Sequence, residues 1–92
     1  MSEDRIRLDK WLWCARFYKT RSIAAEACEK GHLRLNGHRV EKPGRELRPG
    51  DVLTIPQGRT VVAVRVIAGA LRRGPAPEAR QLYDLVEDEP AQ

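Results

Sequence analysis

The spacing of the apolar residues changes at Gly31, and this change constrains the fold more than any other feature of the chain. Before Gly31, apolar residues recur at helical spacing, as in Leu8 and Trp11. After it, Leu33 and Leu35 alternate with polar residues, which is the period of a half-buried strand. The sequence therefore predicts an α+β fold in which two N-terminal helices pack on a small, mostly antiparallel sheet.

The helical part is expected to hold a first helix over residues 8–17 and a second over residues 23–30. Thr20 is the best N-cap candidate for the second helix, and Ser22 is the next, because a side-chain oxygen there accepts a backbone N–H of the first turn. Gly31 is expected to end this helix, since glycine readily adopts the left-handed conformation that closes many helices.

A hairpin is predicted next, because Asn-Gly at positions 36–37 is a strong signal for a two-residue turn between strands. A further strand is expected over residues 52–55 and to stop at Pro56, followed by a long β-branched strand over residues 60–67. Asp51 is expected to cap the turn before residue 52.

The last predicted element is a short C-terminal helix that begins near Pro77, a residue favoured in the first helical turn. Its apolar stripe is expected to consist of Leu82, Leu85 and Val86, before an acidic tail. We therefore divide the chain into one domain over residues 5–68 and a C-terminal extension over residues 69–92.

The chain of 92 residues has room for one domain with one modest core. Its two cysteines, Cys14 and Cys28, are too few for a disulfide framework, so we expect buried, reduced thiols in a cytoplasmic protein. No apolar run approaches the roughly 20 residues of a membrane-spanning helix. A zinc site that combines these cysteines with His32 and His38 is improbable from their spacing.

Basic charge is concentrated in the first half of the chain. Residues 1–50 contain 12 Lys and Arg against 7 Asp and Glu, a net charge of +5, whereas residues 51–92 contain 5 and 6, a net charge of −1. Folding does not require six basic residues around the single Asp9 within positions 5–21. Binding to a polyanion such as RNA does favour such a cluster, because each contact of a basic side chain with a phosphate releases a counterion. These six are Arg5, Arg7, Lys10, Arg16, Lys19 and Arg21.

The order of several motifs resembles a known family. The chain resembles the S-four RNA-binding domain, also called the αL motif, over residues 7 to about 55. The motifs that carry this resemblance are residues 7–12, 16, 19–22, 31, 35–37, 42–43 and 49–51. Within that family, the chain is most similar to the bacterial ribosome-associated heat-shock proteins of about fifteen kilodaltons. The segments that carry this similarity are residues 11–13, 16–21, 71–73 and 77–83.

This resemblance implies that the chain binds ribosomal RNA of large ribosomal subunits that still carry a nascent peptidyl-tRNA, and helps to recycle them. Those proteins continue into a long basic tail, whereas this sequence stops at Gln92 after an acidic stretch. Short relatives of the same family hold the tRNA during quality control of stalled ribosomes, which implies an alternative role in binding structured RNA or tRNA.

The candidate RNA contacts come from three places. Basic side chains before and within the turn between the helices are expected to meet phosphates, and the start of the second helix offers free N–H groups that favour an anion. The hairpin and the loop after it are expected to extend this surface. The predicted set is Arg7, Lys10, Arg16, Lys19, Thr20, Arg21, Ser22, Arg34, Asn36 and Lys42.

Two aromatic residues, Trp13 and Phe17, lie outside the apolar face of the first predicted helix, and two interpretations of their role are open. Their rings stack on unpaired bases, or another part of the fold covers them. The second interpretation, coverage by another part of the fold, is slightly favoured. Trp11 and Leu12 are assigned to the core.

No nucleophile–base set, phosphate-binding loop or metal motif is present in the sequence. We therefore expect a monomeric protein without enzymatic activity or cofactor, which binds ribosomal RNA and the large subunit, with peptidyl-tRNA as a further candidate partner. Two rival classes remain. One is a DNA-binding helix-turn-helix, although Glu26 and Glu29 on the second helix would face the groove; the other is a protein-interaction domain whose charge serves only solubility.

Overall fold

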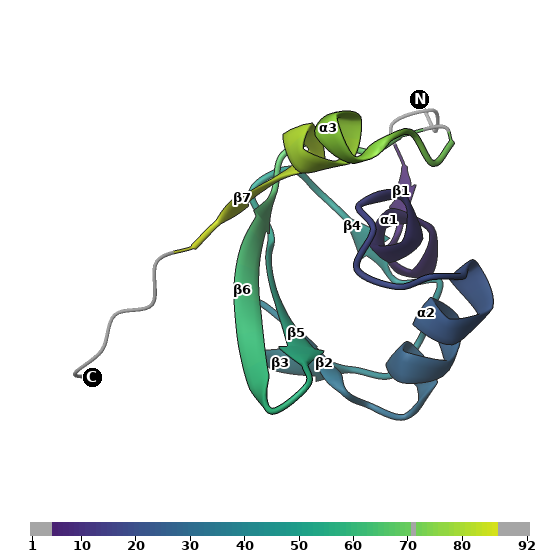
Figure 1. Ribbon diagram of the computed structural model, residues 1–92. Helices are drawn as coiled ribbons and strands as arrows, with labels where there is room; N and C mark the ends of the chain where they lie inside the picture. Colours follow the sequence, from purple (N-terminus) through teal and green to yellow (C-terminus); the bar gives the residue numbers. More distant parts are fainter. Residues whose placement is uncertain (1–4, 71, 87–92) are drawn as a thin grey trace.

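The structure is a computed structural model that describes residues 5–70 and 72–86. Two helices lie on one side of a curved sheet, and a short helix near the C-terminus lies across one end (Figure 1). The elements in chain order are β1 (Ile6–Arg7), α1 (Leu8–Cys14), α2 (Arg21–Glu29), β2 (Leu33–Leu35), β3 (His38–Val40), β4 (Glu46–Leu47), β5 (Val52–Gln57), β6 (Thr60–Val66), α3 (Ala76–Ala79), the 3₁₀ turn η2 (Arg80–Leu82) and β7 (Tyr83–Leu85).

Helix α1 ends at Cys14, so the prediction of a helix over residues 8–17 was too long. The chain leaves the helix because Arg16 adopts a left-handed conformation with φ of 69°. The Arg16 N–H then donates to the Trp13 carbonyl and the Phe17 N–H to the Leu12 carbonyl, at 3.1 and 3.0 Å. This pattern is a Schellman motif, which closes helices and normally has glycine at the left-handed position.

Helix α2 begins at Arg21, two residues earlier than predicted, and its N-cap is Thr20 as predicted. The Thr20 hydroxyl accepts a hydrogen bond from the Ile23 N–H at 3.0 Å. Beyond the helix, Gly31 has a φ of 75° and its N–H donates to the Cys28 carbonyl, which confirms the predicted end of the helix.

The larger sheet has the strand order β3-β2-β5-β6-β7, and every pair in it is antiparallel. The predicted hairpin between β2 and β3 is confirmed, with Asn36 and Gly37 at φ of 51° and 87°. Positive φ at both turn positions matches the right-handed twist of the paired strands. The fold class is therefore the predicted one.

Three details of the sheet differ from the prediction. Strand β5 continues through Pro56 to Gln57. Proline is tolerated there because the pairing of β5 with β2 has already ended at Thr54, so no bond to β2 is lost. The pair formed by β1 and β4, with Ile6 opposite Leu47, was not predicted, because two-residue strands carry no periodic signal.

The third difference concerns the C-terminal segment. The predicted helical stripe of Leu82, Leu85 and Val86 is wrong, since α3 ends at Ala79 and residues 83–85 form β7 on the edge of β6. The free edge of the long strand β6 offers backbone partners that a helix would leave unused. Leu82 is buried, but Leu85 is 69% exposed. The predicted acidic tail and Leu71 lie outside the described residues.

The core lies between α1, α2 and the inner face of the sheet. Trp11 and Leu12 are buried there as predicted, and the Trp11 indole N–H donates to the Ala68 carbonyl at 2.9 Å. Cys14 and Cys28 are buried free thiols, as predicted. Burial raises the pKa of Cys28 to about 12, with smaller contributions from nearby carboxylates, so this thiol stays protonated. The division of the chain at residue 68 remains a prediction.

Candidate RNA interface

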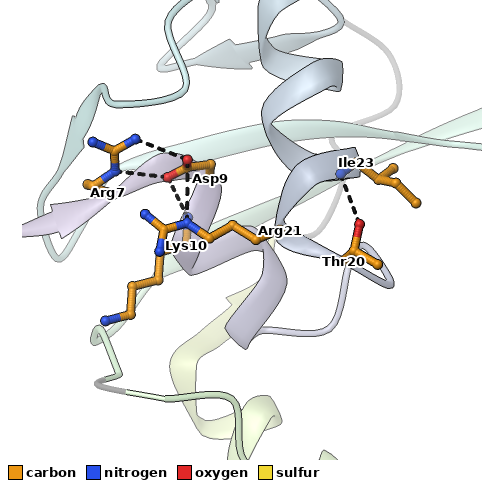
Figure 2. A network of polar contacts seen from close by, with 6 residues as sticks. All are labelled: Arg7, Asp9, Lys10, Thr20, Arg21 and Ile23. Carbon is orange, nitrogen blue, oxygen red and sulfur yellow. Dashed lines mark hydrogen bonds and ion pairs between the residues drawn. The ribbon is translucent and has the colours of Figure 1, made fainter.

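A buried carboxylate organises the basic side chains at the start of α1. The Asp9 side chain is 7% exposed, and its two oxygens accept hydrogen bonds from Nε and Nη2 of Arg7, both at 3.1 Å. Arg21, from the start of α2, places its Nε 3.5 Å from Oδ2 of the same carboxylate. Figure 2 shows the two guanidinium groups reaching Asp9 from different elements, with Lys10 beside them. Both arginine side chains remain about half exposed, at 48% and 43%, so they are ordered and accessible at once.

Competing effects act on the Asp9 carboxyl. Burial, the largest of them, disfavours the charged form and raises the pKa. The hydrogen bonds from Arg7 and the Lys10 backbone N–H, together with the positive charges of Arg21 and Arg7, outweigh burial, so the pKa of Asp9 lies below its usual value. The carboxylate therefore stays ionised at neutral pH and holds the guanidinium groups in place.

The turn between the two helices is fastened to residues 73 and 74. Nε of Arg73 donates to the Trp13 carbonyl at 2.9 Å and its Nη2 to the Tyr18 carbonyl at 3.4 Å. The Arg73 guanidinium also lies over the Trp13 ring, 5.8 Å from the ring centre. In return, Nε of Arg16 donates to the Gly74 carbonyl at 3.1 Å. The left-handed conformation of Arg16 is thus held by contacts from a distant part of the chain.

The two aromatic rings near this turn, Trp13 and Phe17, lie in different surroundings. The Phe17 ring lies 4.9 Å from that of Tyr83 and 6.0 Å from that of Trp11, centre to centre. Trp13 is partly covered by Arg73. Phe17 thus packs against Tyr83 of the sheet, as expected, whereas Arg73, which partly covers Trp13, belongs to neither the sheet nor the last helix, and stacking of Trp13 on a base stays a prediction.

The first turn of α2 continues the basic surface. Thr20 caps the Ile23 N–H, while the N–H groups of Arg21 and Ser22 belong to the helix positions that have no partner within a helix. Lys19 is exposed next to them. Arginine, lysine and unpaired N–H groups thus converge at one end of α2, where the helix dipole also favours an anion.

The loop after β3 also contacts this region. The Leu8 N–H donates to the Arg45 carbonyl and the Asp9 N–H to the Pro43 carbonyl, at 2.9 and 3.0 Å. The loop therefore lies against the start of α1 and places Lys42, which is exposed, near the Asp9 cluster. Here and below, the Asp9 cluster denotes Arg7, Asp9, Lys10 and Arg21.

Two residues of the predicted set lie elsewhere. Arg34 alternates with the buried Leu33 and Leu35, so it lies on the sheet face that points away from the helices. The Asn36 amide donates to Asp51 at 3.1 Å and accepts from the Val52 N–H at 2.9 Å, which joins the hairpin turn to β5. The structure does not bring either residue to the Asp9 cluster.

Asp51 caps its turn as predicted, since its Oδ2 accepts the Arg48 N–H at 2.9 Å.

No role was predicted for Asp9 or Arg73. Asp9 stands out in the sequence as the single acid among six basic residues, and its place in the first turn of a helix, where a carboxylate is favourable, is the signal that could have assigned it one. Arg73 could not have been placed from its sequence position, since its partners Trp13 and Tyr18 lie far away in the chain.

Within residues 5–70 and 72–86, no group of three or more His, Cys, Asp or Glu side chains is arranged to hold a metal ion. No helix in this described part of the chain is long and apolar enough to cross a membrane.

The S4 domain matches residues 6–53, the region that contains the Asp9 cluster and the β2–β3 hairpin. The chain belongs to the S4 domain family. This finding confirms the resemblance drawn from the motifs in the sequence.

Two groups of curated relatives match most of the chain. The heat shock protein 15 homolog of Aeromonas salmonicida is 45% identical over 83 residues, which cover 90% of this chain and 62% of that protein. Heat shock protein 15 of Escherichia coli K12 is 47% identical over 79 residues, 86% of this chain and 59% of that protein. The RQC P-site tRNA stabilizing factor of Halalkalibacterium halodurans is 37% identical over 87 residues, 92% of this chain and 94% of that protein.

The chain thus spans less than two thirds of the length of the heat shock protein 15 relatives that it matches. Among solved structures, heat shock protein 15 of Vibrio cholerae superposes with a TM-score of 0.84 at 43% identity, covering 89% of this chain and 82% of that one. That protein is described as trimeric. For the present chain, the monomeric state remains a prediction.

Proposed function

We propose that this protein binds ribosomal RNA of the large ribosomal subunit, without enzymatic activity, and acts in the rescue of stalled subunits that carry a nascent peptidyl-tRNA. The observation that carries the proposal is the Asp9 cluster, in which a buried carboxylate orders two half-exposed arginines beside the first turn of α2. Ordered guanidinium groups match the spacing of phosphate oxygens and lose little freedom when they bind.

Recognition in this arrangement depends on the shape of the RNA. The major groove of helical RNA is too narrow for side chains to read the bases, so proteins recognise such helices through phosphates and hydroxyl groups. The cations of the Asp9 cluster and Lys19 come from β1, α1, α2 and the turn between the two helices, and this spatial pattern selects a particular backbone path. We propose that Arg7, Lys10, Arg16, Lys19, Thr20, Arg21, Ser22 and Lys42 contact that backbone.

A second role is compatible with the same surface. The relatives named RQC P-site tRNA stabilizing factor match this chain over 89–95% of their own length, whereas the heat shock protein 15 relatives extend well beyond it. The match to relatives with this name supports direct contact with a tRNA on the large subunit as the alternative to binding ribosomal RNA alone.

The DNA-binding alternative has less support. In a helix-turn-helix, the second helix would enter the major groove. Here α2 exposes Glu26 and Glu29, and Glu26 pairs with Lys30 at 3.1 Å, so this helix would present acidic charge to the DNA.

The proposal is tested by sedimentation of a cell lysate through a sucrose gradient, with wild-type protein and the double variant Lys19→Glu/Arg21→Glu compared side by side. A matched control, Arg59→Glu/Arg65→Glu, makes the same change in charge on exposed residues of the β5–β6 hairpin. We expect wild type and control to migrate with the large subunit and the Lys19/Arg21 variant to stay at the top. Thermal melting of all three proteins establishes that each is folded.

Equal loss from both double variants would show that net charge alone drives binding, and would remove the Asp9 cluster from the proposal. Wild-type protein at the top of the gradient would overturn the ribosomal proposal. Reconstitution with large subunits that do or do not carry peptidyl-tRNA separates the two roles, since a tRNA contact predicts tighter binding to the occupied subunits. If the five cations Arg7, Lys10, Arg16, Lys19 and Arg21 each meet a phosphate, the logarithm of affinity should fall against the logarithm of salt concentration with a slope of about −3.5 to −4.5.

A further inference from the structure

A cavity of about 610 Å³ lies next to the Asp9 cluster and shares Arg7 and Lys10 with it. Its volume falls within the range of about 300–1,000 Å³ that is typical of small-molecule sites. One wall comes from β1 and α1 and the other from the segment that follows β6. The lining residues are Arg5, Ile6, Arg7, Lys10, Trp11, Pro49, Ile67, Ala68, Gly69 and Ala70.

The lining combines an apolar interior with positive charge. Ile6, Pro49 and Ile67 provide apolar surface with the buried Trp11 beneath them, while every charged residue that the structure describes in the lining is basic. Figure 2 shows the Lys10 side chain extending away from Asp9 and toward the segment after β6. An occupant of matching chemistry has an apolar, flat part and a negative charge attached to it.

The walls of the cavity are built into the fold. The Trp11 indole is fixed by its hydrogen bond to the Ala68 carbonyl, and the backbone of Ala68 and Ile67 is fixed in turn by the Leu82 carbonyl. Gly69 packs so closely on Ile6 that a Cβ atom at this position would lie 2.8 Å from Ile6 Cγ1. Ile67 is 41% exposed, which leaves one wall within reach of a ligand.

We propose that this cavity receives a single unpaired nucleotide of the bound RNA, with its base between Ile6 and Ile67 and its phosphate on Lys10 and Arg5. This inference rests on the proposed function, because Arg7 and Lys10 belong both to the Asp9 cluster and to the cavity lining. A backbone that follows the cluster therefore passes the mouth of the cavity. A base turned out of a bulge or loop then enters an apolar slot, as unpaired bases do in other RNA-binding proteins.

The test compares two RNA hairpins of equal charge, one fully paired and one with a single bulged adenosine, by fluorescence anisotropy with the complete chain. We expect wild type to bind the bulged hairpin about tenfold more tightly, the scale of one stacked or buried base. Ile67→Glu should abolish this preference, because its carboxylate lies where the base and phosphate would bind. The matched control is Val61→Glu, at an exposed β-branched residue of β6 that is 64% exposed and does not line the cavity, which should keep the preference.

A second measurement locates the base directly. Trp11 lines the cavity and Trp13 does not, so their indole N–H signals in a nitrogen–proton NMR spectrum form an internal pair. Replacing the paired hairpin by the bulged one should shift the Trp11 signal more than that of Trp13.

The outcomes separate this inference from the proposed function. Equal, tight binding of both hairpins by wild type would overturn the nucleotide site and leave RNA binding intact, whereas no binding of either would overturn both. A preference that survives Ile67→Glu would place the base elsewhere. If the Trp11 signal instead responds only to an acidic peptide with apolar residues, the cavity is a peptide site and the nucleotide proposal is wrong.

Discussion

Two basic regions of the molecule hold their charge in different ways. In the Asp9 cluster, Arg7 and Arg21 share one buried carboxylate, at 3.1 and 3.5 Å. On the outer face of the sheet, Arg34 and Arg39 lie directly opposite each other on β2 and β3, so two like charges are neighbours. The ion pair recorded beside them joins Arg39 to Glu41 at 3.8 Å and is exposed.

This difference shows that the surroundings of a cation matter more than its number. The arginines of the Asp9 cluster have already lost side-chain freedom on folding, so binding a phosphate there requires little further ordering. The sheet arginines are exposed and repel each other, so they attract RNA over a distance but do not select its shape. The four predictions that follow test this contrast.

The largest effect is expected from Asp9→Asn. The change keeps the shape of the side chain but removes the charge that Arg7 and Arg21 share. Because both arginines are about half exposed and can regain water, we expect a loss of about 1–3 kcal/mol in the free energy of unfolding, below the cost of breaking a fully buried pair. Urea denaturation measures it.

The control for Asp9→Asn is Asp84→Asn on the edge strand β7, where the side chain is exposed. Its effect should stay within about 0.5 kcal/mol. Equal effects of the two variants would show that Asp9 does not organise the cluster.

The same carboxylate predicts how stability depends on pH. Its pKa in the folded protein lies below the usual value of 3.8. Between the folded and the unfolded pKa, the unfolded chain binds more protons, so acid favours unfolding. The contribution of Asp9 is fully present above the unfolded pKa and is lost as the pH falls through the folded pKa.

Melting temperatures of wild type and Asp9→Asn between pH 7 and pH 2.5 check this pH dependence. The difference between the two proteins should be constant near neutrality and shrink below about pH 4. A constant difference over the whole range would mean that the pKa of Asp9 is not lowered by folding.

The next effect concerns the fastening of the turn between the helices. Arg73→Ala removes two hydrogen bonds to the carbonyls of Trp13 and Tyr18 and the contact with the Trp13 ring. We expect a loss of about 1–2 kcal/mol in stability and weaker RNA binding, because Arg16 and Lys19 lose their fixed positions. Arg72→Ala removes the same charge from an exposed neighbour and serves as the control.

If Arg72→Ala weakens RNA binding as much as Arg73→Ala does, then net charge explains both effects, and the hydrogen bonds from Arg73 to the turn between the helices have no part in binding. At high salt, where charge is screened, a larger loss of RNA binding for Arg73→Ala than for Arg72→Ala would support the role of these hydrogen bonds most directly.

The sequence predicted those parts of the fold that local interactions decide. The N-cap at Thr20, the end of α2 at Gly31 and the turn at Asn36 all follow from conformational preferences of single residues, and all three are confirmed. The helix predicted to contain Leu85 failed because the free edge of β6, a distant partner, decides its structure.

The candidate site shows the same limit. The basic residues near α1 were predictable from charge alone, but their arrangement depends on how close two helix starts come in space. Arg21 reaches Asp9 only because the Schellman turn at Arg16 brings α2 back beside α1. A left-handed arginine is a poor match to local preference, and no sequence rule places one there without the contacts made by Arg73 and Gly74.

The smallest effect is expected on the sheet, where Arg34→Thr removes one member of a like-charged pair. Threonine suits a strand and ends the repulsion from Arg39, so stability should rise by about 0.2–1 kcal/mol. Its RNA affinity should fall no more than that of Arg59→Thr, a loss of the same charge in the β5–β6 turn. If Arg34→Thr instead weakens RNA binding as strongly as Arg7→Ala, the sheet face belongs to the interface. An arginine then need not be ordered by a carboxylate to recognise the RNA, because the RNA phosphate itself would resolve the repulsion between Arg34 and Arg39.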